Sequence, residues 1–327
     1  MDIVNHWKKE ENNIELASYM QEKLMTLPHF LEFENDDHIE ADMRKFLPFK
    51  RFKDILVFGI GGSSLGGQTL YQFKTSDSIN LHFIDNIDPK TFNEKLLKLD
   101  PNTTGVYAIS KSGNTAETLM QTLLAKQHFE TILSDDWSSH FWVLTEDKPS
   151  ALREFATTFN IATFNHNPNI GGRFCIFTNV GATIAALCGF DFMKFRKGAK
   201  DLLLKPIDKL LEGALHLYKL NQHERVNQSV MLVYSDALYF FAKWYAQLFG
   251  ESLGKQKDGI RKGLTPVFAL GAVDQHSQLQ LYLDGPRDKL ISFISISDHE
   301  VTVKVKPLLI EHDALKTLYG KTMDQLY

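Results

Sequence analysis

The chain has 327 residues, of which 43% are apolar, 12% aromatic and 23% charged, and this favours two globular domains and excludes a disordered or fibrous chain. Its 36 Lys and Arg against 40 Asp and Glu give a formal net charge of −4, which does not favour nucleic acid or anionic lipid as a partner. We expect a cytoplasmic protein with no membrane association, because the N-terminus lacks a signal-peptide pattern and no apolar run approaches the ~18 residues of a membrane span.

The apolar pattern predicts an α/β chain with two parallel sheets. An amphipathic helix is expected around residues 12–26. Four apolar runs then alternate with helical stretches, which indicates a parallel sheet covered on both faces; the runs are residues 54–60, 81–85, 105–110 and 140–145. A weaker series begins after Pro206, with a long apolar helix over 236–253 and strands at 228–234, 264–270 and 289–296. We therefore expect a first domain over residues 1–204 and a second over 205–327.

Two loops that follow predicted strands carry candidate phosphate-binding groups. Ligands of open parallel sheets settle beyond the carboxyl ends of the strands. In the first loop, GIGGSSLGG, Gly62 lets backbone N–H groups approach an anion and Ser63 adds a hydroxyl, although a plain glycine turn explains the pattern equally well. The second loop, SKSGNTAET, gathers four polar side chains before a helix: Ser110, Lys111, Ser112 and Thr115. A helix cap accounts for one hydroxyl but not for four polar groups, which favours phosphate binding.

Three further segments each hold one candidate catalytic residue. Arg173 follows two glycines in NIGGRFCIFTNVG, where a fixed guanidinium would stabilise a developing oxyanion. Glu251 ends an otherwise apolar helix, where desolvation would raise its affinity for protons and suit a general base. His276 lies in a polar stretch that follows a predicted strand, and its ordinary pKa lies near physiological pH. Taken singly, each residue is explained more simply as an ion-pair, helix-end or loop residue.

The sequence predicts neither a redox centre nor a metal site. Cys175 and Cys188 lie in one apolar segment without a C-x-x-C spacing, so we expect buried, structural thiols. The 12 histidines form no H-E-x-x-H motif and no short spacing with cysteine. We expect no metal and no cofactor.

Together these segments resemble, in order, the motifs of the glucose-6-phosphate isomerase (phosphoglucose isomerase) family in its short bacterial type. The matching stretches are GIGGSSLGG, SKSGNTAET, GGRFCIFTNVG, ESLGKQKDG and DQHSQLQLYLDGP. The resemblance implies two sugar-isomerase (SIS) domains, each a parallel sheet flanked by helices in a Rossmann-like sandwich. It also implies isomerisation of glucose 6-phosphate and fructose 6-phosphate through a cis-enediol, in glycolysis and gluconeogenesis, without metal or cofactor.

The resemblance assigns a role to each candidate residue. Glu251 looks like the base that moves a proton between C1 and C2, and Arg173 looks like the cation that steadies the enediolate. His276 looks like the group that assists ring opening, contributed by the neighbouring subunit of a homodimer. The expected phosphate ligands are Ser63, Ser110, Lys111, Ser112 and Thr115. Further expected substrate contacts are Gly62, Gly172 and Gln325.

The C-terminus departs from the family pattern. Family members carry a C-terminal helix whose lysine reaches the active site, whereas here a matching Gln325 lies just before the last residue of the sequence, Tyr327. Either Lys316 or Lys321 substitutes for that lysine, or the lysine is missing. The alternative function is therefore a non-catalytic sugar-phosphate-binding SIS protein or a truncated isomerase. The motif spacing leaves open whether mannose 6-phosphate is also accepted.

Overall fold

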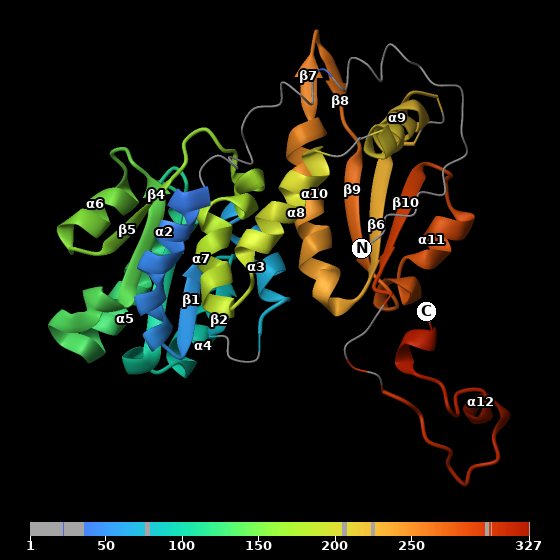
Figure 1. The fold of residues 1–327 in the computed structure, drawn as a ribbon, viewed down its shortest axis with the longest axis horizontal. Coiled ribbons are helices and arrows are strands. Elements are labelled where there is room, and N and C mark those ends of the chain that lie inside the picture. The colour runs from blue at the N-terminus through green and yellow to red at the C-terminus, as the bar shows by residue number, and fades with distance from the viewer. Residues whose placement is uncertain are drawn as a thin grey trace.

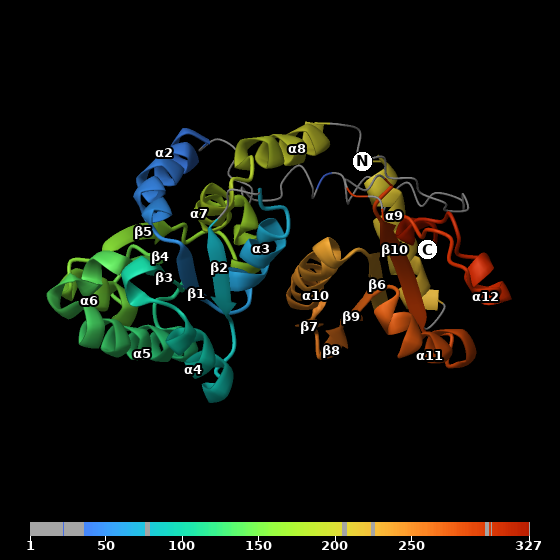
Figure 2. The same cartoon turned by 90° about the horizontal axis from the view of Figure 1, so that it is seen from below.

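The computed structural model describes residues 22, 36–75, 79–204, 208–223, 226–297, 301 and 303–326. The helix expected around residues 12–26 lies outside these ranges, apart from Glu22, which is helical. The described chain forms two parallel sheets with helices packed against them (Figures 1 and 2). The predicted α/β fold with two parallel sheets is thus confirmed.

The first sheet has five parallel strands in the order β2-β1-β3-β4-β5. Its strands are β1 (Asp54–Phe58), β2 (Asn80–Ile84), β3 (Thr104–Ile109), β4 (Phe141–Glu146) and β5 (Ala162–His166). The sequence predicted all of these except β5, an edge strand in which polar residues interrupt the apolar run and only Phe164 and His166 are buried. The strand order reverses between β1 and β3, and this is where parallel sheets open a crevice at their carboxyl ends.

Helices cover both faces of the first sheet because side chains alternate along each strand. Ile55 and Val57 of β1 pack in one cluster with residues of α7 (Asn179–Cys188), whereas Leu56 and Phe58 pack in another with α4 (Pro89–Lys98), α5 (Ala116–Leu133) and α6 (Ala151–Thr158). The remaining helical elements of this half are α2 (Asp36–Phe46), η2 (Leu47–Arg51), α3 (Gly62–Tyr71), η3 (Pro101–Thr103), η4 (Ser134–His140), η5 (Gly172–Phe177) and α8 (Phe192–Leu204).

The second sheet has three parallel strands in the order β10-β6-β9. They are β6 (Gln228–Tyr234), β9 (Thr265–Leu270) and β10 (Lys289–Ser295), all at predicted positions. Met231 and Val233 face α10 (Tyr239–Leu253), and Val230 and Leu232 pack with Tyr282 of α11 (Leu279–Asp284). The other elements are α9 (Asp208–His223), η6 (Asp236–Leu238), β7 (Lys255–Lys257), β8 (Ile260–Lys262), η7 (Val273–His276), α12 (Asp313–Lys316) and η8 (Met323–Leu326). The short antiparallel pair β7 and β8 is polar apart from Ile260 and was not predicted.

The backbone of α3 lies very close to that of η5 at Gly62. A Cβ atom on Gly62 would lie 2.1 Å from the carbonyl oxygen of Gly172, a distance that no packing permits. Cys175 Sγ donates a hydrogen bond to the Gly62 carbonyl at 2.9 Å. The glycine-rich turn after β1 is therefore needed for the approach of two backbones, not only for the turn itself.

We expect Gly62→Ala to lower the free energy of unfolding by about 1–3 kcal/mol, because the two backbones must separate to admit the methyl group. Gly198→Ala is the matched control, since Gly198 is an exposed residue of α8 and a Cβ atom on it would meet no other atom within 4 Å. That control should raise the free energy of unfolding by up to about 1 kcal/mol. Urea titration of both variants measures the two effects, and equal effects would refute the packing argument.

Candidate functional site

Two helices begin at the crevice between β1 and β3 without a capping side chain. Gly61 precedes α3 and Thr115 precedes α5, and neither makes a side-chain hydrogen bond to its helix among the described residues. The first backbone N–H groups of a helix have no partner within the helix, and the helix dipole favours negative charge there. The start of α5 can therefore bind an anion such as a phosphate group, whereas at the start of α3 the Ser63 and Ser64 amides already donate to the Ile60 and Gly61 carbonyls.

The loop between β3 and α5 gathers three of the predicted hydroxyls. Ser110 Oγ and Thr115 Oγ1 are hydrogen-bonded at 2.8 Å, and the Gly113 amide donates to Ser110 Oγ at 3.1 Å. The Asn114 amide donates to Ser112 Oγ at 3.2 Å. Gly113 has a φ of +68°, and a Cβ atom there would lie 2.1 Å from Ser150 Oγ, so only glycine fits this turn. We call residues 110–115 the cradle loop.

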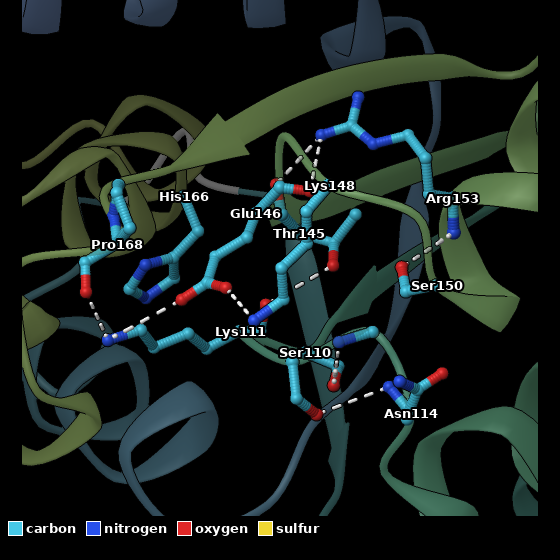
Figure 3. A network of polar contacts seen from close by, with 12 residues as sticks. Ser110, Lys111, Asn114, Thr145, Glu146, Lys148, Ser150, Arg153, His166 and Pro168 are labelled. Carbon is cyan, nitrogen blue, oxygen red and sulfur yellow. Dashed lines mark hydrogen bonds and ion pairs between the residues drawn. The ribbon is translucent and has the colours of Figure 1, made fainter.

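The side chain of Lys111 is held by backbone carbonyls rather than by the hydroxyls of the cradle loop. Its Nζ donates to the carbonyl oxygen of Pro168 at 2.8 Å and lies 3.6 Å from Glu146 Oε1 (Figure 3). It also donates to the carbonyl oxygen of Ile170 at 2.7 Å. These contacts were not predicted, because they join segments that are more than 30 residues apart in the sequence. They connect the cradle loop to the residues that precede Gly171, Gly172 and Arg173.

Arg173 and Glu251 come from the two halves of the chain and meet. Arg173 Nη1 lies 3.5 Å from Glu251 Oε2, and Arg173 Nε donates to Ser252 Oγ at 2.8 Å. Trp244 Nε1 donates to the Arg173 carbonyl at 2.9 Å, so α10 holds both the backbone and the guanidinium of this residue. A fixed cation is thereby placed beside a carboxylate, as proton abstraction next to a carbonyl group requires.

The Glu251 side chain is half covered, which agrees with the partial desolvation expected at the end of an apolar helix. Half of its side-chain surface (50%) is exposed, because the last turn of α10 does not pack into the core of the second sheet. Gln247, one helical turn earlier, donates to Glu251 Oε1 at 2.9 Å and orients the carboxylate. Sequence reasoning missed Gln247, although its spacing of four residues from Glu251 on a helix was a usable signal.

His276 and Gln325 lie away from this meeting point. His276 is an exposed residue of η7, which follows the carboxyl end of β9. Gln325 belongs to η8, where its Oε1 accepts a hydrogen bond from the Thr322 amide at 2.9 Å. Figures 1 and 2 both show α12 and the C-terminus across the second sheet from α10. Lys316, one of the two lysines named as a substitute, lies in α12 and forms an ion pair with Glu311.

The remaining candidate reactive groups are the two cysteines and possible metal ligands. Cys175 and Cys188 are buried as predicted, and burial raises the pKa of Cys175 to about 12 and also raises that of Cys188. The described residues contain no cluster of three or more His, Cys, Asp or Glu side chains able to hold a metal ion. Within the same part of the chain, no helix is both long and apolar enough to cross a membrane.

Comparison with known proteins decides the family. The model of the family described as phosphoglucose isomerase matches residues 28–320. The chain belongs to this family. It is 34% identical over 299 residues to a glucose-6-phosphate isomerase of Carboxydothermus hydrogenoformans, covering 85% of this chain and 64% of that protein. It is 35% identical over 278 residues to a glucose-6-phosphate isomerase of Thermus thermophilus, covering 84% of this chain and 66% of that protein.

A solved structure supports the same fold. A hypothetical protein of Thermus thermophilus matches with a TM-score of 0.87 and 32% identity, covering 95% of this chain and 78% of that one. The family resemblance seen in the motifs is thus confirmed. The chain nevertheless spans slightly less than two thirds of the length of the two curated family members above, 64% and 66%.

Proposed function

We propose that this chain is an aldose-ketose isomerase that interconverts glucose 6-phosphate and fructose 6-phosphate through a cis-enediol, as in glycolysis and gluconeogenesis. The proposal rests on one observation above the others, the 3.5 Å approach of the Arg173 guanidinium to the Glu251 carboxylate. Both residues lie in motifs shared with the family, and family members at 34–35% identity are glucose-6-phosphate isomerases. No metal or cofactor forms part of this proposal.

In the proposed site, the phosphate of the substrate lies between the starts of α3 and α5. Ser63, Ser110, Ser112 and Thr115 donate to it, together with backbone amides that include those of Gly62 and Lys111. Contacts to the phosphate supply binding energy away from the reacting carbons. This binding energy is used to hold C1 and C2 of the sugar next to the Glu251 carboxylate. The backbone of Gly172 lies against Gly62 and so borders the same crevice.

The proposed chemistry divides between the two residues that meet across the halves. Glu251 removes a proton from C1 or C2 and returns it to the other of these two carbons. Between the two steps, negative charge develops on the oxygen of the adjacent carbonyl group. Arg173 stabilises that charge, since a guanidinium stays protonated and its N–H groups point in fixed directions. Because Ser252 and Trp244 already hold Arg173, little reorganisation is needed as the charge develops.

The assay that tests this proposal follows conversion of fructose 6-phosphate by the purified 327-residue chain, with glucose 6-phosphate formation coupled to reduction of NADP. Turnover supports an active isomerase. An increase in melting temperature with sugar phosphate, without any turnover, would instead support the alternative of a sugar-phosphate-binding protein. Parallel assays with mannose 6-phosphate decide whether this second sugar is accepted.

We also propose a homodimer in which His276 serves the site of the partner chain. Since α10 returns antiparallel to the strands of the second sheet, Glu251 lies at their amino ends, whereas His276 follows the carboxyl end of β9. Figure 1 shows α10 ending near β7, at the opposite end of this sheet from the connection between β9 and α11. A helix of 15 residues spans ~22 Å, so one chain cannot bring both side chains to one sugar without rearrangement.

Mixing two inactive variants tests the dimer. We expect Glu251→Gln and His276→Ala to be inactive alone and to recover about a quarter of wild-type activity when equal amounts exchange subunits, because half of the dimers are mixed and each has one intact site. Exchange is achieved by co-expression with two affinity tags. Absence of recovery in isolated mixed dimers would refute the shared site.

Two further expectations belong to the same proposal. The chain divides into domains near residue 205, so that each parallel sheet has its own domain, and the protein acts in the cytoplasm. The division is supported by the separate apolar clusters of the two sheets. Gln325 remains a proposed substrate contact, which would need the C-terminal segment to reach the site of another subunit.

A further inference from the structure

Three neighbouring strands end in a row of polar side chains that the proposed chemistry does not use. Lys111 follows β3 by two residues, Glu146 ends β4 and His166 ends β5, and Glu146 and His166 are paired across the two strands. The ladder continues past the strand ends, since the Glu146 amide donates to the Lys111 carbonyl at 3.1 Å. Figure 3 shows the three side chains side by side at this edge of the sheet.

Three contacts hold the Lys111 ammonium group at this edge. Two of its three N–H donors bind the carbonyl oxygens of Pro168 and Ile170. The third contact is an ion pair with Glu146, whose Oε1 lies 3.6 Å from Nζ. Lys111 therefore ties the segment of residues 168–170 to the cradle loop, in which Lys111 itself lies.

That segment continues directly into the residues that hold Arg173. On its C-terminal side, the chain is held by the contact of Gly172 with Gly62 and by the hydrogen bond from Trp244 to the Arg173 carbonyl. The segment itself is held by the hydrogen bonds from Lys111 to Pro168 and Ile170. The distance between the phosphate end of the site and the guanidinium thus depends on where the ammonium group of Lys111 sits.

Glu146 is the carboxylate that forms an ion pair with this ammonium group. Only 8% of its side chain is exposed, and it also pairs with Lys148, which is 54% exposed. Desolvation raises the pKa of Glu146, but the hydrogen bond from Lys148 and the charges of Lys148 and Lys111 outweigh it and lower the pKa overall. Burial and the charge of Lys111 lower the pKa of His166, so a neutral imidazole does not compete with the Lys111 ammonium for the Glu146 carboxylate.

We infer that Glu146 is a positioning residue for the proposed isomerisation. It holds the Lys111 ammonium group against the carbonyl oxygens of Pro168 and Ile170, and it thereby sets the position of Arg173 relative to the cradle loop. This inference rests on the proposed function. Glu146 itself touches neither the substrate nor the reacting atoms.

The variant that tests this is Glu146→Gln, which keeps the shape of the side chain and removes its charge. We expect kcat to fall about 10- to 100-fold, because a displacement of about 1 Å at a catalytic cation has effects of that size. KM should change less than about threefold, since the hydroxyls of the cradle loop keep their contacts within the loop. Glu154→Gln, an exposed residue of α6, makes the same chemical change and should keep wild-type kinetics.

A double-mutant cycle shows whether Glu146 acts through Lys111. Lys111→Met should itself lower kcat, and adding Glu146→Gln to it should lower kcat by less than about twofold more. Three results would each overturn the inference. The first is an equally large loss of kcat when Glu146→Gln is added to Lys111→Met, the second is wild-type kcat in Glu146→Gln alone, and the third is a change in KM without a change in kcat. If Glu146→Gln does not fold, Glu146→Asp replaces it, with an expected loss of about 3- to 10-fold in kcat and wild-type kcat as the contrary result.

Amide hydrogen exchange separates this inference from the proposed function. In Glu146→Gln, the amides of residues 171–173 should exchange faster than in Glu154→Gln, because their tether has been loosened. If the wild-type chain shows no turnover, the proposed function fails, yet faster exchange would still uphold the role of Glu146 in holding this segment. Unchanged exchange would overturn that role whether or not the chain is active.

Discussion

Glu251→Gln is expected to lower kcat for isomerisation about 10³-fold, since general-base groups of this kind contribute about 10²–10⁴-fold. The amide keeps the volume of the side chain and can still accept the hydrogen bond from Gln247, but it cannot take a proton from carbon. KM should change little because the proposed phosphate contacts are on the other half of the chain. Activity within about tenfold of wild type would contradict the assignment of the base.

Two controls make this result specific. Glu154→Gln removes an exposed carboxylate outside the site and should keep wild-type kinetics. Inorganic phosphate should raise the melting temperature of Glu251→Gln as much as that of the wild type, because residue 251 is not part of the proposed phosphate site. Loss of this shift would mean that the variant has damaged the cradle loop rather than the chemistry.

Arg173→Lys is expected to lower kcat about 10²- to 10³-fold, the range found when one donor to a developing oxyanion is removed. Arg173 reaches Ser252 through Nε and Glu251 through Nη1 at the same time, and the single nitrogen of lysine cannot serve both. The positive charge is retained, so a large loss would report on geometry rather than on charge alone.

Arg44→Lys is the matched control for this substitution. Arg44 lies on α2 with 65% of its side chain exposed and pairs with Glu40 at 3.3 Å, so its replacement should leave kcat unchanged. Steady-state kinetics of both variants measure the difference. Equal and small effects for the two arginines would contradict the role given to Arg173.

The sequence predicted the buried strands well because burial on both faces forces a continuous apolar run. β1 and β3 are buried along their whole length and were located to within two residues. β5 was missed because an edge strand needs apolar residues on one face only, and the antiparallel pair β7 and β8 was missed because its residues other than Ile260 are polar.

The candidate site was predictable to the extent that it depends on strand ends. Ser110 and Ser63 could be placed together because parallel strands bring their carboxyl ends to one edge. The contact between Arg173 and Glu251 could be expected only from family resemblance, since nothing local in either segment specifies how the two halves pack. The tether of Lys111 to Pro168 and Ile170 depends on three loops at once and left no pattern in the sequence.

The central claim is that this chain moves a proton between adjacent carbons of a sugar phosphate, and the most direct measurement is isomerisation of fructose 6-phosphate in D2O. Mass spectrometry and NMR of the product report the hydrogen at C2. The account predicts glucose 6-phosphate with deuterium at C2 for the wild type and none above background for Glu251→Gln, because the carboxyl proton exchanges with solvent. A wild-type chain that binds the sugar phosphate but forms no glucose 6-phosphate would contradict the account and identify a binding protein.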